Sequence, residues 1–306
     1  MHKMELTCYA GSLECLKAAL ESGADSVYVG GESFGRDTLS DDFSREDLIE
    51  GIKFAHENNK KVYVTINLLP HNKDFKEFEA YLKTLDELNV DAVIVSEAGT
   101  LITVKQILPE MKIHLSNVSN VYNYETANFW HEQGVDRVVI SRELSIKEME
   151  TMRLNTPESL ELEAYVHGPV IMSYSGRKLI TSYLESKGKD NYSSKKKYNL
   201  TEEKRQGQYS PVYEDEAGTI FFASRDLCMI EYLDKFIRAG VSTLTIEARL
   251  NDEKYVREVV PVYRKAIDDF YNNNFEYNCT EDMLETLKNA TPRKHTTGFY
   301  LDETID

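Results

Sequence analysis

The chain has 306 residues, more than a typical single domain, although one barrel or one large α/β fold can accommodate this length. Charged residues make up 29% and hydrophobic residues 41%, with 15 glycines and 7 prolines, which excludes fibrous, collagen-like and disordered proteins. The 36 basic and 52 acidic side chains give a net charge of −16, which disfavours tight autonomous binding to nucleic acid.

No apolar stretch approaches the roughly 18 residues that a membrane helix needs, and the start, MHKMELTCYAG, lacks a basic region followed by a long apolar core. Cys8, Cys15, Cys228 and Cys279 are scattered without a CxxC pair, so neither a disulfide framework nor a local zinc site is indicated. We therefore expect a cytoplasmic protein with reduced thiols, no membrane contact and no metal site.

Short β-branched runs alternate with amphipathic stretches, a pattern typical of parallel strands joined by helices. The eight predicted strands are 6–10, 26–30, 61–67, 92–97, 112–117, 137–142, 160–167 and 243–249. The predicted helices are 12–22, 44–58, 74–88, 99–108, 122–133, 145–155, 226–239 and 252–273. Ser44 and Asp47 form a capping-box pattern, and glycines follow several helices. This alternation predicts an α/β fold of the (β/α)8, TIM-barrel-like class.

Residues 169–220 interrupt the alternation, because they hold Ser, Tyr, Lys and Gly and end in a predicted hairpin through DEAGTIFFAS. We interpret them as an insertion after the seventh strand of a barrel domain at 1–273. A C-terminal tail at 274–306 should add one short helix and a basic-aromatic strand. The basic run from Lys187 to Arg205 within the insertion is either a solvated loop or a contact surface for an anionic partner.

Polar residues at the carboxyl ends of the strands are the candidates for a functional site, because chemistry lies at that end of such barrels. Arginines there could bind a carboxylate or phosphate bidentately, and glutamates could orient or neutralise them. Each arginine–glutamate pair could instead be a structural salt bridge, or be catalytic. The ligand-binding candidates are Arg36, Asn67, Glu97, Asn117, Arg142 and Arg249, and the catalytic candidates are Glu143 and Glu247.

His167 ends the seventh strand in YVHGP, where an imidazole could be a general base, a ligand or a hydrogen-bonded structural residue. SYSGR, which follows, is not GxSxG, so no serine nucleophile is assigned. Tyr174 and Arg177 of that segment are further candidates for substrate binding. HENNK at 56–60 lacks the second histidine of HExxH, and no glycine-rich phosphate loop is present, so the residues alone leave the reaction type open.

Several segments resemble the collagenase-like peptidases of unassigned catalytic type, over most of residues 5–270. They include GSLECLKAALESGADSVYVGGESFGR, HLSNVSNVYNYETANFW, LELEAYVHGPVIMSYSGRKLITSYL and, in the tail, HTTGFY. The resemblance implies a barrel-like catalytic region, proteolysis of the collagenase type, and relatives that act in tRNA, rRNA or ubiquinone hydroxylation. In the tRNA branch the product is 5-hydroxyuridine at the wobble position, and prephenate is a required metabolite.

The cysteine pattern of that family is interrupted in this chain. The family motif resembles HGxxC, SYSGxC, a third cysteine-containing stretch and DLC, whose cysteines are understood to bind an iron–sulfur cluster. Here Ile171 and Lys178 occupy the first two positions, the third stretch reads SSKKKYNL, and Cys228 of DLC remains. Because a four-iron cluster needs about four thiolates, we expect this chain to bind no cluster and no other cofactor of its own.

The resemblance and the missing cysteines together imply a short, cysteine-depleted family member that supports a longer paralogous subunit in prephenate-dependent hydroxylation of the tRNA wobble uridine. The basic segment Lys187–Arg205 would then contribute to a shared tRNA surface. The alternative function is that of a collagenase-like endopeptidase, a hydrolase of unassigned mechanism. A carboxylate-binding protein or a scaffold is a third interpretation.

Overall fold

The computed structural model describes residues 3–31, 34, 43–67, 70–188, 196–201, 203–204, 208–215 and 218–301. Eight parallel strands close into a barrel, because β11 pairs with both β1 and β7. The barrel strands are β1 (Glu5–Ala10), β2 (Ser26–Gly30), β3 (Lys61–Thr65), β4 (Ala92–Val95), β5 (Ile113–Leu115), β6 (Arg137–Val139), β7 (Glu161–Ser175) and β11 (Thr243–Ile246). Each contains the core of a predicted strand, and the predicted (β/α)8 class is confirmed.

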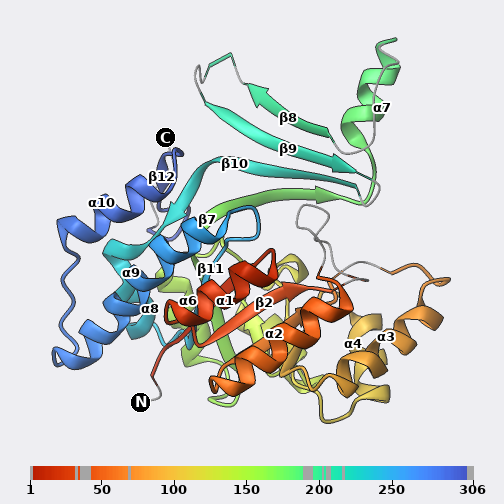
Figure 1. The fold of residues 1–306 in the computed structure, drawn as a ribbon, viewed down its shortest axis with the longest axis horizontal. Coiled ribbons are helices and arrows are strands. Elements are labelled where there is room, and N and C mark those ends of the chain that lie inside the picture. Colours follow the sequence, from red (N-terminus) through yellow and green to blue (C-terminus); the bar gives the residue numbers. More distant parts are fainter. Residues whose placement is uncertain are drawn as a thin grey trace.

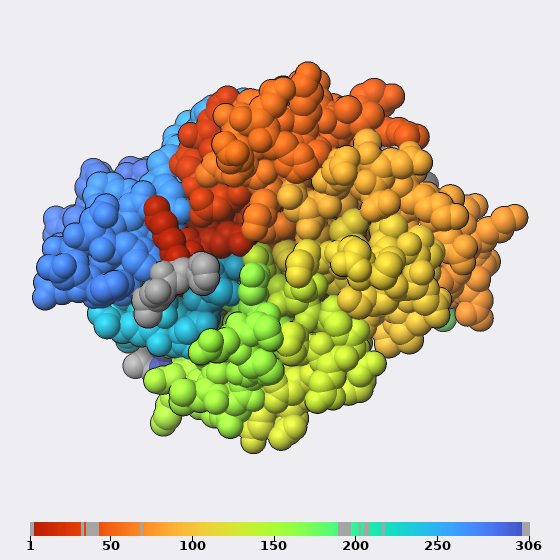
Figure 2. All heavy atoms as spheres, turned by 90° about the horizontal axis from the view of Figure 1, so that it is seen from below, coloured from red at the N-terminus to blue at the C-terminus, as the bar shows by residue number. Residues whose placement is uncertain are grey.

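Helices surround the barrel, and Figure 2 shows the chain passing around the ring in sequence order, from red to blue. They are α1 (Leu13–Glu21), α2 (Arg45–Glu57), α3 (Phe75–Glu87), α4 (Ala98–Ile107), α5 (Tyr124–Glu132), α6 (Ile146–Leu154), α8 (Leu233–Arg238) and α9 (Glu253–Asn272), with 3-10 turns η1 (Asn117–Ser119) and η2 (Ile230–Tyr232). In the described ranges, no helix combines the length and the apolar composition that crossing a lipid bilayer requires.

The inside of the barrel differs from the layer between the barrel and its helices. Aliphatic side chains fill the outer layer, whereas Tyr9, Tyr28 and Tyr63 occupy equivalent register positions on three neighbouring strands and are each 2% exposed. Because successive side chains of a strand point to opposite faces, these tyrosines face the interior, while the residues that flank them, such as the valines beside Tyr28 and Tyr63, face the helices. The tyrosines therefore bring hydroxyl groups to the barrel interior.

A charged network around Arg137 closes the amino-terminal end of the barrel. The Arg137 guanidinium donates to Glu161 at 2.6 Å, to Glu5 at 2.8 Å and to Glu163 at 3.4 Å. Burial raises the pKa of Glu5, but the charge and hydrogen bonds of Arg137, together with a hydrogen bond from Tyr63, outweigh it and hold this pKa at about 2. The charge of Arg137 is therefore compensated entirely within the protein.

After its barrel portion, β7 continues into a projecting sheet, seen at the top of Figure 1. This projecting sheet consists of residues 169–175 of β7 and of β10 (Gly218–Cys228), β9 (Tyr209–Asp215) and β8 (Lys196–Thr201), all antiparallel. Helix α7 (Leu179–Ser186) follows β7. The predicted hairpin through DEAGTIFFAS corresponds to β9 and β10, and the insertion after the seventh strand is confirmed. Much of the basic segment 187–205 lies outside the described residues.

The predicted helix at 226–239 is wrong in its first part. Residues 226–228 belong to β10, where Asp226 pairs with Pro169 and Cys228 pairs with His167 of β7, and α8 begins only at Leu233. Pairing with a strand about 60 residues earlier overrides the local helical pattern, because sheet formation depends on neighbours that a sequence window does not contain.

The tail returns to the barrel and contacts β10 and β7. It contains the predicted short helix, α10 (Glu281–Ala290), and a strand, β12 (His295–Thr296). Strand β12 pairs with β10 at Asp226, and the buried Tyr300 donates a hydrogen bond to the Tyr165 carbonyl oxygen at 2.9 Å. The tail therefore supports the strand that carries the predicted site residue His167.

Candidate functional site

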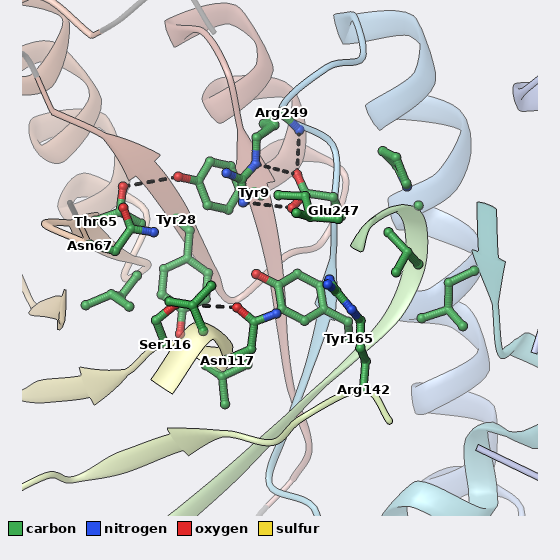
Figure 3. A pocket seen from close by; sticks show the side chains of 18 of the residues that line it. Tyr9, Tyr28, Thr65, Asn67, Ser116, Asn117, Arg142, Tyr165, Glu247 and Arg249 are labelled. Carbon is green, nitrogen blue, oxygen red and sulfur yellow. Dashed lines mark hydrogen bonds and ion pairs between the residues drawn. The ribbon is translucent and has the colours of Figure 1, made fainter. Parts of the chain in front are cut away.

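A pocket lies where the carboxyl ends of the barrel strands meet the first part of the projecting sheet (Figure 3). Seven predicted site residues line it, namely Asn67, Asn117, Arg142, Tyr174, His167, Glu247 and Arg249. Its further lining includes Tyr9, Tyr28, Thr65, Ser116, Glu163, Tyr165, Ile171 and Ile220. The barrel thus brings together side chains that are up to 240 residues apart in the sequence, counted from Tyr9 to Arg249.

Arg249 and Glu247, which follow β11, form a buried ion pair on one side of the pocket. Arg249 donates from Nε to Glu247 Oε1 at 2.9 Å and from Nη2 to Oε2 at 2.8 Å, and its guanidinium carbon lies 3.9 Å from the Tyr9 ring centroid. Gly11 permits this arrangement, because a Cβ at that position would lie 2.4 Å from the Arg249 carbonyl oxygen. The bidentate pair and the ring fix the orientation of the guanidinium.

Arg142, which follows β6, provides a second cation in the pocket. It is half-buried, and its guanidinium forms no hydrogen bond or ion pair with any residue that the structure describes. Burial lowers the pKa of Arg142, partly opposed by Tyr165, Tyr300 and the nearby glutamates, but an arginine stays charged at neutral pH. Figure 3 shows its guanidinium beside the ring of Tyr165. Arg142 is therefore suited to bind an anionic group that enters the pocket.

Aromatic rings and neutral polar groups form the remaining walls. Tyr9 donates to Thr65 Oγ1 at 3.1 Å, because the Thr65 hydroxyl itself donates to a backbone carbonyl at 3.1 Å. Asn67 and Asn117 contribute amides from the ends of β3 and β5, and Tyr165 and Tyr174 contribute rings from β7. Such walls suit a small ligand with an apolar or ring portion and several hydrogen-bonding oxygens.

Glu163 links the pocket to the charged network at the other end of the barrel. Its side chain is fully buried, and it accepts hydrogen bonds from Tyr28 and from Thr245, the latter at 2.7 Å. Burial raises the pKa of Glu163, although Arg137 and these hydrogen bonds oppose the rise. His114 lies against Tyr28 on the opposite side, with Nδ1 at 3.1 Å from the hydroxyl. One part of the pocket lining is therefore the hydrogen-bonded carboxylate of Glu163.

The ring of His167 points out of the barrel toward α9, although the residue lines the pocket. Tyr263 donates to the Val166 carbonyl oxygen at 3.0 Å, so His167 Nδ1–H donates to the Tyr263 oxygen at 3.2 Å. The imidazole also packs against Tyr255 and His295. Burial, with the adjacent His295, lowers the pKa of His167 to about 3, so the ring is neutral at pH 7. These contacts are typical of a structural histidine, and a catalytic role for His167 stays a prediction.

Other candidates lie away from the pocket. Glu97 directly precedes α4 and accepts hydrogen bonds from two of its backbone N–H groups, so the end of the strand is also the N-cap of a helix. Glu143 is exposed and accepts a hydrogen bond from Tyr122. Arg177 is exposed in the turn between β7 and α7, and Arg36 lies outside the described residues. The structure does not bring Glu97, Glu143 or Arg177 into the pocket lining.

The cysteine positions of the family motif do not fit an iron–sulfur cluster. Ile171 lines the pocket with an aliphatic side chain, and Lys178 presents an amine. Cys228 is largely enclosed beside Tyr263, and burial raises the pKa of its thiol to about 11. Within the described residues, no three His, Cys, Asp or Glu side chains are grouped to hold a metal ion. A thiolate set for a cluster is therefore not supplied by these positions.

The sequence prediction missed the residues that face the barrel interior from within the strands. Tyr9, Tyr28, Glu163 and Tyr165 all line the pocket but precede the strand ends that were searched. A usable signal was present, because CYA, VYV and VYV place a tyrosine at matching positions in the first three strands. Inward-facing hydroxyls of this kind can only be recognised once the register of neighbouring strands is considered.

Comparison with known proteins is consistent with this architecture. The family model for peptidase family U32 matches residues 11–305. The tRNA hydroxylation protein P of Escherichia coli is 34% identical over 350 residues, covering all of this chain and 76% of that protein. The tRNA hydroxylation protein P2 of Bacillus subtilis is 34% identical over 312 residues, with full coverage of both chains.

Among solved structures, the U32 peptidase Mk0906 superposes with a TM-score of 0.53 at 15% sequence identity, covering 81% of this chain and 94% of that one. At this identity the match supports the fold alone. The family match and the two relatives confirm the resemblance found from the sequence segments. The chain belongs to peptidase family U32.

Proposed function

We propose that this protein acts in tRNA hydroxylation, as a subunit or accessory factor in prephenate-dependent 5-hydroxylation of the wobble uridine. The carrying observation is the full-length match to the tRNA hydroxylation protein P2, in a chain whose pocket holds a half-buried arginine available to an anion. The net charge of −16 argues against tight RNA binding by this chain alone, so a partner is expected to contribute to RNA binding.

Prephenate is the ligand that we propose for the pocket. Its carboxylates would meet Arg142, whose guanidinium has no protein partner among the described residues, and its ring would lie among Tyr9, Tyr165 and Tyr174. The amides of Asn67 and Asn117 and the hydroxyl groups of the pocket could bind the remaining oxygens. The Arg249–Glu247 pair would stay intact and set the shape of the wall.

A partner subunit is proposed because this chain does not supply a cluster site at the family positions. Ile171 and Lys178 replace two cysteines of the motif, and the remaining Cys228 has a thiol with a raised pKa. A longer, cysteine-complete paralogue would provide the cluster, and the basic segment Lys187–Arg205 would contribute to the shared tRNA surface.

The function is tested by mass spectrometry of nucleosides from total tRNA of a strain that lacks this gene. Loss of 5-hydroxyuridine-derived wobble nucleosides, restored by the wild-type gene, is expected. Arg142→Gln should fail to restore them, whereas Arg45→Gln, an exposed arginine on α2, should restore them fully. An unchanged nucleoside profile in the deletion strain, with other hydroxylation routes also deleted, would contradict the proposal. Restoration without the longer paralogue would contradict its accessory role.

An endopeptidase is the second candidate function, favoured by the family to which the chain belongs. A serine peptidase needs a nucleophile within hydrogen-bonding reach of a base. Here His167 is turned toward α9 and Ser173 lies exposed on the projecting sheet, so the two do not form such a pair. Cleavage of a peptide library by the purified chain, lost in His167→Ala but retained in the matched surface variant His56→Ala, would favour the peptidase.

A further inference from the structure

A row of side chains crosses the projecting sheet from the pocket to its outer strand. Tyr174 of β7 is directly opposite Ile220 of β10, Ile220 is opposite Tyr213 of β9, and Tyr213 is opposite Lys197 of β8. Directly opposed residues on neighbouring strands point to the same face of a sheet. Because Tyr174 and Ile220 line the pocket, Tyr213 and Lys197 lie on the face that continues from the pocket.

This tyrosine–lysine row (Tyr174, Ile220, Tyr213 and Lys197) spans about 14 Å, given the roughly 4.8 Å between neighbouring strands. Phe222, which is 1% exposed, contacts the Tyr213 ring edge-on at 5.6 Å and so limits its motion. The exposed Lys197 places Nζ 5.1 Å from the centroid of the same ring. The row therefore presents a positioned aromatic ring and an ammonium group side by side.

The same face extends along β9 to an additional exposed aromatic side chain. Tyr209 lies four residues before Tyr213 and therefore shares its face, and it is 56% exposed. Rings interspersed with amines on a sheet surface are a common mode of binding single-stranded nucleic acid, since bases stack on the rings and phosphates meet the amines. Lys197 gives this face an ammonium group that a phosphate can contact, beside the rings on which a base can stack.

We propose that the tyrosine–lysine row binds single-stranded nucleotides of the RNA beside the mouth of the pocket in which prephenate is proposed to lie. One neighbouring base stacks on Tyr213, its phosphate contacts Lys197, and Tyr174 marks the point where the chain of nucleotides meets the pocket. This inference rests on the proposed function in tRNA hydroxylation and adds to it the residues that position the RNA.

Helix α7 provides a matched control, because it is anchored to the other face of the projecting sheet. The backbone N–H groups of Leu179 and Ile180 donate to Thr219 and Glu214, at 2.9 and 2.7 Å. These two acceptors are adjacent in sequence to Ile220 and Tyr213 and so point away from the row. On α7, Tyr183 is 61% exposed, and on the barrel Lys235 of α8 places Nζ 4.8 Å from the ring centroid of Tyr232, a pair of the same chemistry as Lys197 and Tyr213.

The test measures binding of the full chain to a fluorescently labelled RNA hairpin with a uridine-containing loop, by anisotropy at several salt concentrations. Tyr213→Leu should weaken binding roughly 10-fold, and Tyr213→Phe should retain it, because stacking needs the ring and not the hydroxyl. Lys197→Gln should reduce the slope of log affinity against log salt by about 0.7. Tyr183→Leu and Lys235→Gln should bind as wild type does.

No measurable binding by the wild-type chain, wild-type affinity in both row variants, or loss confined to the control variants would overturn the inference. Far-ultraviolet circular dichroism and thermal unfolding of each variant identify any loss of binding that is due to misfolding. The same variants are then tested for restoring wobble nucleosides in the deletion strain. If wild type restores the nucleosides and the row variants do so equally well, the row is wrong and the proposed function stands; if the deletion strain has a normal nucleoside profile, the proposed function fails.

Discussion

Two arginines on either side of β6 show how the two ends of this barrel differ. Arg137 begins the strand and is 2% exposed, with three carboxylates within hydrogen-bonding distance. Arg142 follows the strand and is half-buried, without a hydrogen bond or ion pair to any described residue. Only five positions separate them in the segment RVVISR, so the difference arises from the neighbours that the fold provides.

The comparison separates a structural arginine from one that is available to a ligand. At the amino-terminal end of a (β/α)8 barrel, buried polar groups contribute to stability, whereas the carboxyl end builds the functional site. A buried charge is tolerated when its partners are present, and leaving such a charge without partners is strongly unfavourable. Arg142 avoids that cost through partial exposure and remains available to an anion.

The largest effect is expected from Arg137→Met. Removing the guanidinium leaves the fully buried Glu163 near the partly buried Glu5 without a compensating charge, which should lower the free energy of unfolding by about 3–5 kcal/mol. Urea denaturation measures the change. The exposed Arg238→Met, which removes one hydrogen bond to the Phe275 carbonyl oxygen, should cost only about 1 kcal/mol, and a similarly small effect of Arg137→Met would show that the network is not needed for stability.

The same network predicts a dependence of stability on acid. The pKa of Glu5 is about 2 in the folded protein and about 4.5 when unperturbed, so the unfolded chain binds more protons between these values. Its contribution is complete above about pH 4.5 and is lost as the pH falls toward 2, by roughly 3 kcal/mol at most. Urea denaturation at pH 5, 4 and 3 should show that the free energy of unfolding falls less steeply with decreasing pH for Glu5→Gln than for wild type or for the exposed Glu110→Gln. Parallel curves for all three proteins would contradict this assignment.

Most of the fold could be predicted from the sequence, because valine-rich runs and amphipathic stretches report directly on parallel strands and covering helices. The error at 226–239 arose because the CMIEYLDKFI segment has a helical pattern, while the preceding residues are determined by pairing with β7. The sequence predicted only a hairpin where the structure has the projecting sheet. Strands β8 and β9 are stabilised by pairing with neighbouring strands, and their own sequences lack a strong alternation of apolar and polar residues.

The site could be predicted only in part, for a related reason. The strand ends predicted Arg142, Arg249 and four further lining residues, because the barrel geometry fixes where those ends meet. They also predicted Glu97, since a strand end is often the start of the next helix and a carboxylate suits both positions. Tyr28 and Tyr165 were missed, because a tyrosine inside a strand is common and its direction depends on register.

The smallest effect on stability, and the sharpest test of the comparison, is expected from Arg142→Gln. Because the guanidinium has no hydrogen-bonding partner among the described residues, its removal should change the free energy of unfolding by no more than about 0.5 kcal/mol. Prephenate binding, followed by isothermal titration calorimetry, should weaken by roughly 10- to 100-fold, as expected when a charge-assisted hydrogen bond is lost. The prephenate affinity of Arg142→Lys should lie between those of wild type and Arg142→Gln, because lysine keeps the charge but cannot form a bidentate hydrogen bond. If Arg142→Gln instead destabilised the protein as strongly as Arg137→Met while leaving prephenate affinity unchanged, the two ends of β6 would be equivalent and the pocket would need another anion-binding residue.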